Sequence, residues 1–194
     1  KHFARLDVLI NNAGLTGWAN FFDTTEEKWD VVLDTNLKGT FFCSLAAARW
    51  MRETKTAGSI VNVSTIEAFR GIPGNAIYSA FKAGVTGFTR SLALELAPSN
   101  IRVNAISAGP IKTLAFAGIA DGRYILKWNE LNSPLKRNIT SEEVGNAGLY
   151  LLSDLGTAVT GEVMHVDGGY HVVGMVKTSS AKQIAELLNG FEGE

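Results

Sequence analysis

Short apolar runs alternate along this chain with longer amphipathic stretches, and this alternation constrains the fold more than any other feature. A short apolar run bounded by turn residues is typical of a buried strand, and the longer stretches are typical of helices. Strands that alternate with helices pair in parallel through right-handed crossovers. The sequence therefore predicts an α/β fold, a Rossmann-like parallel sheet with flanking helices. The expected strands are 6–10, 59–64, 101–106 and 162–166, and the expected helices include 37–53, 75–97 and 141–153.

Two helix starts match the capping box, in which a Ser or Thr side chain and a Glu three residues later satisfy each other's backbone donors. One is Thr24 with Glu27, and the other is Thr140 with Glu143. We expect a helix to begin directly after each of these two threonines.

Length, charge and hydropathy narrow the class of protein. The chain has 194 residues, 46% of them hydrophobic, and a net charge of −1. This length predicts a single domain over residues 1–194, with 112–134 as a substrate lid and 176–194 as a tail. The balanced charge gives no reason to expect a nucleic-acid partner. No apolar run reaches the roughly 18 residues of a membrane helix, so no membrane partner is expected either.

The cysteine and the histidines bear on compartment and metal binding. Cys43 is the only cysteine, which excludes an internal disulfide and favours a cytoplasmic location. It lies in an apolar stretch, so we expect it to be buried. His2, His165 and His171 show no spacing typical of metal ligands, and no metal is predicted.

Polar clusters follow the expected strands. Asn11-Asn12, Ser64-Thr65 and Ser107 all lie at carboxyl ends of these strands. Ligands of open α/β sheets bind outside those ends. The sequence therefore predicts a ligand site at this edge.

Tyr78 and Lys82 are four residues apart on an expected helix, which puts them on one helical face. An ammonium group beside a phenol stabilises the phenolate and lowers the tyrosine pKa from about 10. Such a tyrosine can exchange a proton near neutral pH. An isolated pair at this spacing is more often a surface contact, so the interpretation depends on the motifs around it.

Several motifs stand around this pair in a fixed order. They are Asn11–Gly14 after the first strand, Asn36 in the segment 34–39, Ser64-Thr65, the segment 78–84, and 102–110. Together they resemble the short-chain dehydrogenase/reductase family over residues 5–175. This resemblance implies hydride transfer with NAD or NADP as the cofactor.

The resemblance also implies catalytic roles. Tyr78 would be the general acid/base, Lys82 would bind the nicotinamide ribose and tune Tyr78, and Asn36 would hold a water in a proton relay. The family's substrate-orienting serine stands thirteen residues before the tyrosine, and Thr65 occupies that position here. Threonine keeps the hydroxyl, but its methyl group restricts χ1.

The remaining expected contacts divide between cofactor and substrate. The expected cofactor-binding residues are Asn12, Ala13, Gly14, Tyr78, Lys82, Gly109, Pro110, Ile111 and Thr113. The expected substrate-binding residues are Ser64, Thr65, Phe116, Ile119 and Trp128. The last three would give the lid an apolar wall, and ordinary lid packing explains them equally well.

The two parts of the chain resemble different branches of the family. Residues 5–106 resemble the 3-oxoacyl-carrier-protein reductases, whereas 104–175 resemble the bacterial enoyl-acyl-carrier-protein reductases, so a chimera with a seam near Asn104 is one hypothesis. The enoyl reductases have six residues between tyrosine and lysine, and the corresponding position here is Asn75. The Tyr-x3-Lys spacing favours reduction of a carbonyl.

We therefore expect the chain to reduce a 3-oxoacyl thioester in fatty acid biosynthesis, with acyl carrier protein as a candidate partner. Enoyl reduction is the alternative within enzymes, and a catalytically inert oligomerising fragment or chimera is the alternative from another class. Apolar residues crowd two expected helices, which predicts a homodimer or homotetramer. These residues are Phe41, Phe42, Leu45, Trp50, Val85, Phe88, Leu92 and Leu96.

No Gly-x-Gly-x-x-Gly motif occurs in the sequence. The family has its phosphate-binding loop on the first strand–helix turn, at a helix N-terminus. By resemblance, that N-terminal βαβ half would precede Asn11 and is expected to be lacking, along with the residue that selects NAD or NADP. Either the sequence is part of a longer chain, or it is a half-fold with an open sheet edge.

Overall fold

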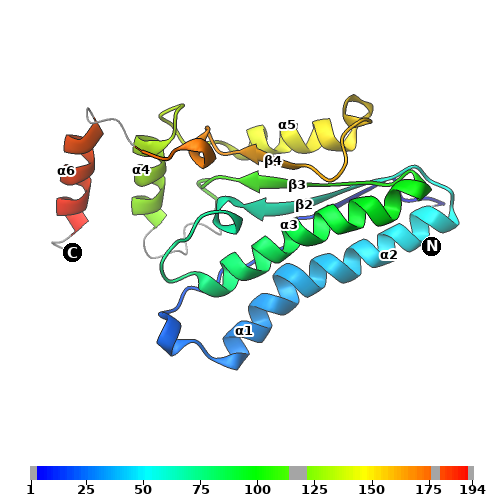
Figure 1. The fold of residues 1–194 in the computed structure, drawn as a ribbon, viewed down its shortest axis with the longest axis horizontal. Coiled ribbons are helices and arrows are strands. Elements are labelled where there is room, and N and C mark those ends of the chain that lie inside the picture. The colour runs from blue at the N-terminus through cyan, green and yellow to red at the C-terminus, as the bar shows by residue number, and fades with distance from the viewer. Residues whose placement is uncertain (1–3, 114–121, 176–179, 192–194) are drawn as a thin grey trace.

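The computed structural model describes residues 4–113, 122–175 and 180–191. Its four strands form one sheet in the order β1 (Val8–Asn11), β2 (Ser59–Thr65), β3 (Arg102–Ala108) and β4 (Val163–Val166). All neighbouring pairs are parallel. The strand arrows in Figure 1 accordingly point the same way, so their carboxyl ends lie along one edge. The predicted parallel α/β sheet is confirmed.

Helices connect the strands. The longer ones are α1 (Glu26–Leu33), α2 (Gly39–Glu53), α3 (Ala76–Leu96), α4 (Gly122–Asn132), α5 (Ser141–Leu152) and α6 (Ala181–Phe191). Short turns are η1 (Phe21–Asp23), η3 (Ile66–Ala68), η4 (Ala97–Ser99), η6 (Asp154–Gly156) and η7 (Tyr170–Val172). The π-helical turn η2 (Asp34–Lys38) joins α1 to α2 without a break, where we expected the second helix to begin near residue 37.

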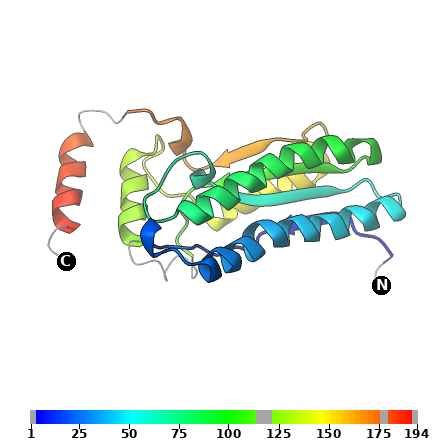
Figure 2. The same cartoon turned by 60° about the horizontal axis from the view of Figure 1, so that its bottom comes forward.

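Helices cover both faces of the sheet, which gives two apolar layers. Ile60 and Val103 pack with Met51 of α2 and with Ala93 of α3. The neighbouring Val61 faces the other way and packs with Leu151 of α5. Figures 1 and 2 show α2 and α3 lying side by side along the sheet, with α5 near β4. Strands covered on both faces are apolar throughout, which is why they read as continuous apolar runs.

One of the two predicted helix starts is confirmed and the other is wrong by one residue. Thr140 and Glu143 form the complete capping box that begins α5. At α1 the cap is Thr25, whose hydroxyl accepts from the Lys28 N–H at 3.2 Å. Thr24 instead ends the preceding turn, because its N–H donates to Phe21 O and its hydroxyl donates to Asn20 O. The start of α1 therefore shifts by one position.

Cys43 is exposed, which contradicts its expected burial. Helix α2 directs Phe41, Phe42 and Cys43 away from the sheet and Ser44 towards it. Ser44 is fully buried and accepts a hydrogen bond from Asn11 Nδ2 at 2.9 Å. Within the described residues, no helix is long and apolar enough to cross a membrane.

Candidate active site

A cavity of about 460 Å³ opens at the carboxyl ends of β2 and β3. It brings together nearly all the described residues for which the sequence predicted a cofactor or substrate role. Those that line it are Asn12, Gly14, Ser64, Thr65, Tyr78, Lys82, Gly109, Pro110, Ile111 and Thr113. Ala13 is exposed and does not line it. Motifs up to 101 positions apart in the sequence therefore meet at one cavity.

Tyr78 and Lys82 lie one turn apart on α3, and both face this cavity. Lys82 is only 4% exposed, and its ammonium group donates to Val63 O at 2.7 Å. Burial lowers the pKa of Lys82 to about 8. The Lys82 Nζ atom lies 5.7 Å from the centroid of the Tyr78 ring.

The pKa of Tyr78 lies above its usual value, which is opposite to the direction that the sequence predicted. Burial is the main cause, the negative charge of Glu67 adds to it, and a hydrogen bond with Thr65 opposes both. Removal from water costs the charged phenolate more solvation free energy than it costs the neutral phenol, so burial raises the pKa. The lysine four residues away does not offset that loss in this geometry.

Asn36 lies in the π-helical turn and is fully buried. Its Nδ2 donates to Leu15 O at 2.8 Å and to Val32 O at 3.0 Å, which fixes the orientation of the amide. Its Oδ1 is buried and accepts no hydrogen bond from the described residues. A β-carbon at Gly14 would come within 2.9 Å of Asn36 Oδ1 and 3.4 Å of Lys82 Nζ. Asn36 and Lys82 therefore converge on one point beside Gly14.

Glu67 is a cavity residue that the sequence analysis missed. It follows β2 in the turn η3, two residues beyond Thr65. Its Oε2 accepts a hydrogen bond from Asn75 Nδ2 at 2.7 Å, and burial raises the pKa of its carboxyl group. The signal in the sequence was an acid directly after an apolar strand, where the chain turns at the ligand edge.

The expected lid contains a helix, α4, in a stretch that shows no clean helical period. Ile125 of α4 lines the cavity. Trp128 instead donates its indole N–H to the hydroxyl of Tyr170 at 2.9 Å, so it ties α4 to η7. This hydrogen bond helps to hold α4 in position. Trp128 is not among the residues that line the cavity. Phe116 and Ile119 lie outside the described residues.

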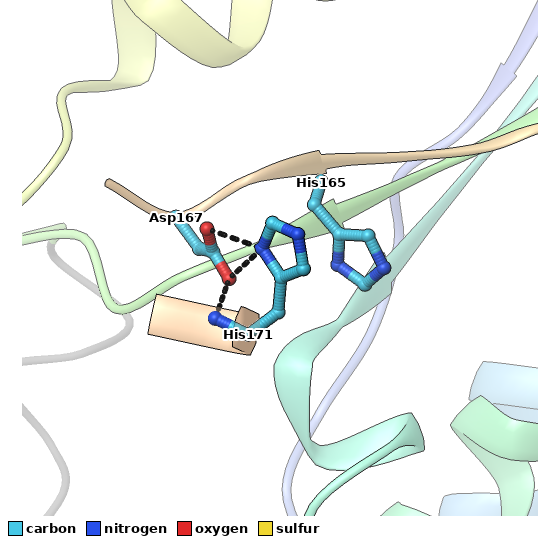
Figure 3. A group of neighbouring side chains, drawn as sticks. All are labelled: His165, Asp167 and His171. Atoms are coloured by element: carbon cyan, nitrogen blue, oxygen red, sulfur yellow. Dashed lines mark hydrogen bonds and ion pairs between the residues drawn. The ribbon is translucent and has the colours of Figure 1, made fainter. Parts of the chain in front are cut away.

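His165, Asp167 and His171 gather at the end of β4, a grouping that their spacing did not indicate (Figure 3). One ligand atom from each lies within 4.8 Å of the others. His171 Nδ1 lies 3.0 Å from both carboxylate oxygens of Asp167, and the two imidazole rings stack 4.0 Å apart. Ring nitrogens bind ions in the plane of the ring, and these planes differ by only 11°. One ring would have to turn before both could bind one ion, so the geometry fits a stacked Asp–His pair better than a metal centre.

Comparison with known proteins finds relatives that match most of the chain. A family model described as enoyl-(acyl carrier protein) reductase matches residues 1–171. The chain is 47% identical over 173 residues to an enoyl-[acyl-carrier-protein] reductase [NADH] of Rhizobium meliloti, with 89% of the chain and 61% of the relative covered. It is 43% identical over 164 residues to the 3-oxoacyl-[acyl-carrier-protein] reductase of Aquifex aeolicus, with 84% and 65% covered.

A solved structure is similar to this chain in fold and in sequence. The crystal structure of an enoyl-(acyl-carrier-protein) reductase from Anaplasma phagocytophilum in complex with NAD has a TM-score of 0.83 and 38% identity, with 91% of this chain and 68% of that one covered. The predicted resemblance to both branches is confirmed. The chain spans 61% to 65% of the length of these two curated relatives.

Proposed function

Because the chain belongs to the short-chain dehydrogenase/reductase family, we propose that it transfers a hydride between NAD or NADP and a carbonyl/alcohol pair. One observation carries this proposal: Thr65, Tyr78 and Lys82 line a single cavity, and Asn36 adjoins it. The proposed catalytic residues are therefore Asn36, Thr65, Tyr78 and Lys82.

The cavity fits a nicotinamide cofactor. Gly14 leaves open the space where a β-carbon would meet Asn36 Oδ1 and Lys82 Nζ. Gly109 lies so close to Asp167 that a β-carbon would come within 3.0 Å of its main chain. Asn12, Gly14 and the segment 109–111 would then hold the cofactor mainly through backbone atoms. When bound, the nicotinamide would give or take the hydride, and the protein would supply orientation and the proton.

The proton step belongs to Tyr78. In the direction of reduction, its phenol O–H would give its proton to the carbonyl oxygen, and the hydroxyl of Thr65 would hold that oxygen in place. The phenolate left on Tyr78 needs positive charge nearby, which Lys82 would supply from the same face of α3. The Oδ1 of Asn36, which accepts no hydrogen bond from the part of the chain that the structure describes, would then hold a water that returns the proton.

We propose a 3-oxoacyl thioester as the substrate, with acyl carrier protein as a candidate partner. The Tyr78-x3-Lys82 spacing supports a ketone as the reacting group. The relatives' names support an acyl group. The cavity wall includes apolar side chains that could receive a chain, among them Leu15, Ile72 and Ile125.

The test is to assay the full-length chain with acetoacetyl and crotonyl thioesters, using NADH and NADPH. We expect the acetoacetyl thioester to be reduced with the higher kcat/KM. Reduction of crotonyl thioester without ketone activity would contradict the proposal.

Enoyl reduction is the second candidate, and one observation favours it: the family model and the relative from Rhizobium meliloti both have enoyl reductase names. That relative matches across both parts of the chain, including the expected seam near Asn104. Under this function Asn75 would occupy the position of the tyrosine of the enoyl reductases. Asn75 is fully buried, and its side-chain amide donates a hydrogen bond to Glu67. The site geometry therefore favours the ketone.

A further inference from the structure

Much of the cavity wall is apolar. The apolar side chains that line it include Leu15, Trp18, Ile66, Ile72 and Ile125. Among the described residues that line the cavity, Glu67 is the one acid. A purely apolar substrate would give this carboxyl group no hydrogen bond. The presence of Glu67 in the wall therefore requires another explanation.

Glu67 is held in place from two sides. Its main-chain N–H lies 3.4 Å from the hydroxyl of Thr65, which also caps the turn η3. Its side-chain Oε2 accepts from Asn75 Nδ2 at 2.7 Å, and Asn75 is fully buried at the start of α3. The carboxyl group is therefore oriented by the same elements that position Thr65 and Tyr78. Besides Asn75, the hydroxyl of Ser79 also stabilises the carboxylate through a hydrogen bond. A carboxylate accepts about four hydrogen bonds, so further acceptor positions remain after those from Asn75 and Ser79.

This arrangement has two costs. A carboxyl group removed from water loses solvation free energy unless donors replace the water. Its charge also raises the pKa of Tyr78, which works against the phenolate that the proposed proton step needs. A donor brought in by the substrate would offset both costs, because it would solvate the carboxylate and withdraw charge from its oxygens.

We propose that Glu67 is a substrate-recognition residue that accepts a hydrogen bond from an N–H or O–H group located beyond the reacting carbonyl. This inference rests on the proposed carbonyl reduction and adds the substrate feature that the site selects. Two chemical sources fit such a donor. One is the amide N–H that follows the sulfur in CoA and carrier-protein thioesters, and the other is a hydroxyl on the ketone itself.

The experiment compares matched substrates that differ only in the donor. The first pair is the acetoacetyl thioester of N-acetylcysteamine and its analogue in which the amide N–H is replaced by an ester oxygen. The second pair is 4-hydroxy-2-butanone and 4-methoxy-2-butanone. The ratio of kcat/KM within each pair is measured for the unaltered full-length chain, Glu67→Gln, Glu67→Leu and the exposed control Glu53→Leu.

A hydrogen bond to a charged group predicts a preference of about 10-fold or more for the donor-bearing member of one pair. Glu67→Leu should reduce that ratio to about 1, because leucine accepts no hydrogen bond. Glu67→Gln should keep part of the preference through its amide oxygen, and Glu53→Leu should keep all of it. A preference in the first pair assigns the donor to the thioester arm, and one in the second pair assigns it to a hydroxyl.

Equal ratios in the unaltered chain and in Glu67→Leu, for both pairs, would overturn the inference and leave the proposed function standing. If the unaltered chain reduces none of the four ketones, the proposed function fails and the inference fails with it. Glu67→Gln keeps the size of the side chain but replaces the charged carboxylate with a neutral amide that has one acceptor oxygen. A ratio lower than in the unaltered chain therefore tests the idea even if Glu67→Leu does not fold.

Discussion

The ammonium group of Lys82 donates to the main-chain oxygen of Val63 at 2.7 Å, and it lies 5.7 Å from the centroid of the Tyr78 ring. The lysine is thus anchored to strand β2 while its charge stays on the same side of α3 as the phenol. This geometry separates two effects that the sequence could not distinguish. Burial changes the pKa of both side chains, and the charge of Lys82 acts only once a phenolate forms.

Tyr78→Phe should lower kcat by about 100-fold or more, the usual scale for general acid–base catalysis. Cofactor affinity should remain within a few-fold, because the ring and its packing are kept. Steady-state kinetics and a fluorescence titration with NADH and NADPH measure the two quantities. Unchanged turnover in a folded Tyr78→Phe protein would remove Tyr78 from the mechanism.

Lys82 predicts a dependence of stability on pH. Its pKa falls from 10.5 when exposed to about 8 in the folded protein, so between these values the unfolded chain binds more protons. The free energy of unfolding should therefore rise with pH across this window, by at most about 1.4 kcal/mol per pH unit. Below pH 8 the lysine is charged in both states, and the cost of burying that charge is present in full.

Lys82→Met lacks this titration and is the matched control. Chemical denaturation of both proteins from pH 7 to 10.5 should show the unaltered protein gaining stability relative to Lys82→Met above pH 8. Parallel curves would mean that the ammonium is solvated more than its burial indicates. The same variant should lose turnover at every pH, because no charge remains to stabilise the phenolate.

The sequence predicted the sheet, its parallel direction and the edge where the cavity lies, because these follow from the alternation of apolar runs with helices. The polar residues after each strand then had to meet, and Asn12, Thr65 and Gly109 do line one cavity. What a helical residue faces could not be predicted from its neighbours in the chain. Cys43 lies in an apolar run and is exposed, whereas Ser44 beside it is buried.

Contacts between distant segments explain the remaining differences. The partner of Trp128 is Tyr170, which lies 42 positions later in the sequence, so its role in holding α4 was not visible in the sequence alone. Glu67 gains its place in the cavity through Asn75 at the start of the next helix. The raised pKa of Tyr78 results mainly from burial, which spacing along a helix does not reveal.

Thr65 and Ser64 can be told apart by substitution. Both residues line the cavity, but they make different hydrogen bonds. The hydrogen bond of Thr65 with Tyr78 offsets part of the rise in the pKa of that phenol that burial causes, whereas the buried Ser64 donates to Lys82 O at 3.3 Å. Thr65→Ala should therefore lower kcat by at least about 10-fold, and Thr65→Ser should keep or raise it. Ser64→Ala should mainly reduce stability. Loss of turnover in Ser64→Ala with a harmless Thr65→Ala would assign the orienting hydroxyl to Ser64.

The outer faces of α2 and α3 predict self-association. Phe41 and Phe42 are 44% and 57% exposed, and the ring of Phe41 contacts that of Phe88 with centroids 5.2 Å apart. Leu45 and Leu92 line a hollow of about 650 Å³ between the same helices. Because Val85 is buried but Phe41 and Phe42 stay exposed, a second copy related by two-fold symmetry would cover these rings with an identical face. Light scattering of the full-length chain at micromolar concentration should give a dimer or tetramer, and Phe42→Asp should lower the mass.

Phe22→Asp, at a 90% exposed position in the turn η1, is the control and should leave the mass unchanged. A monomer in the unaltered protein would contradict the prediction and leave the apolar face of α2 without a role.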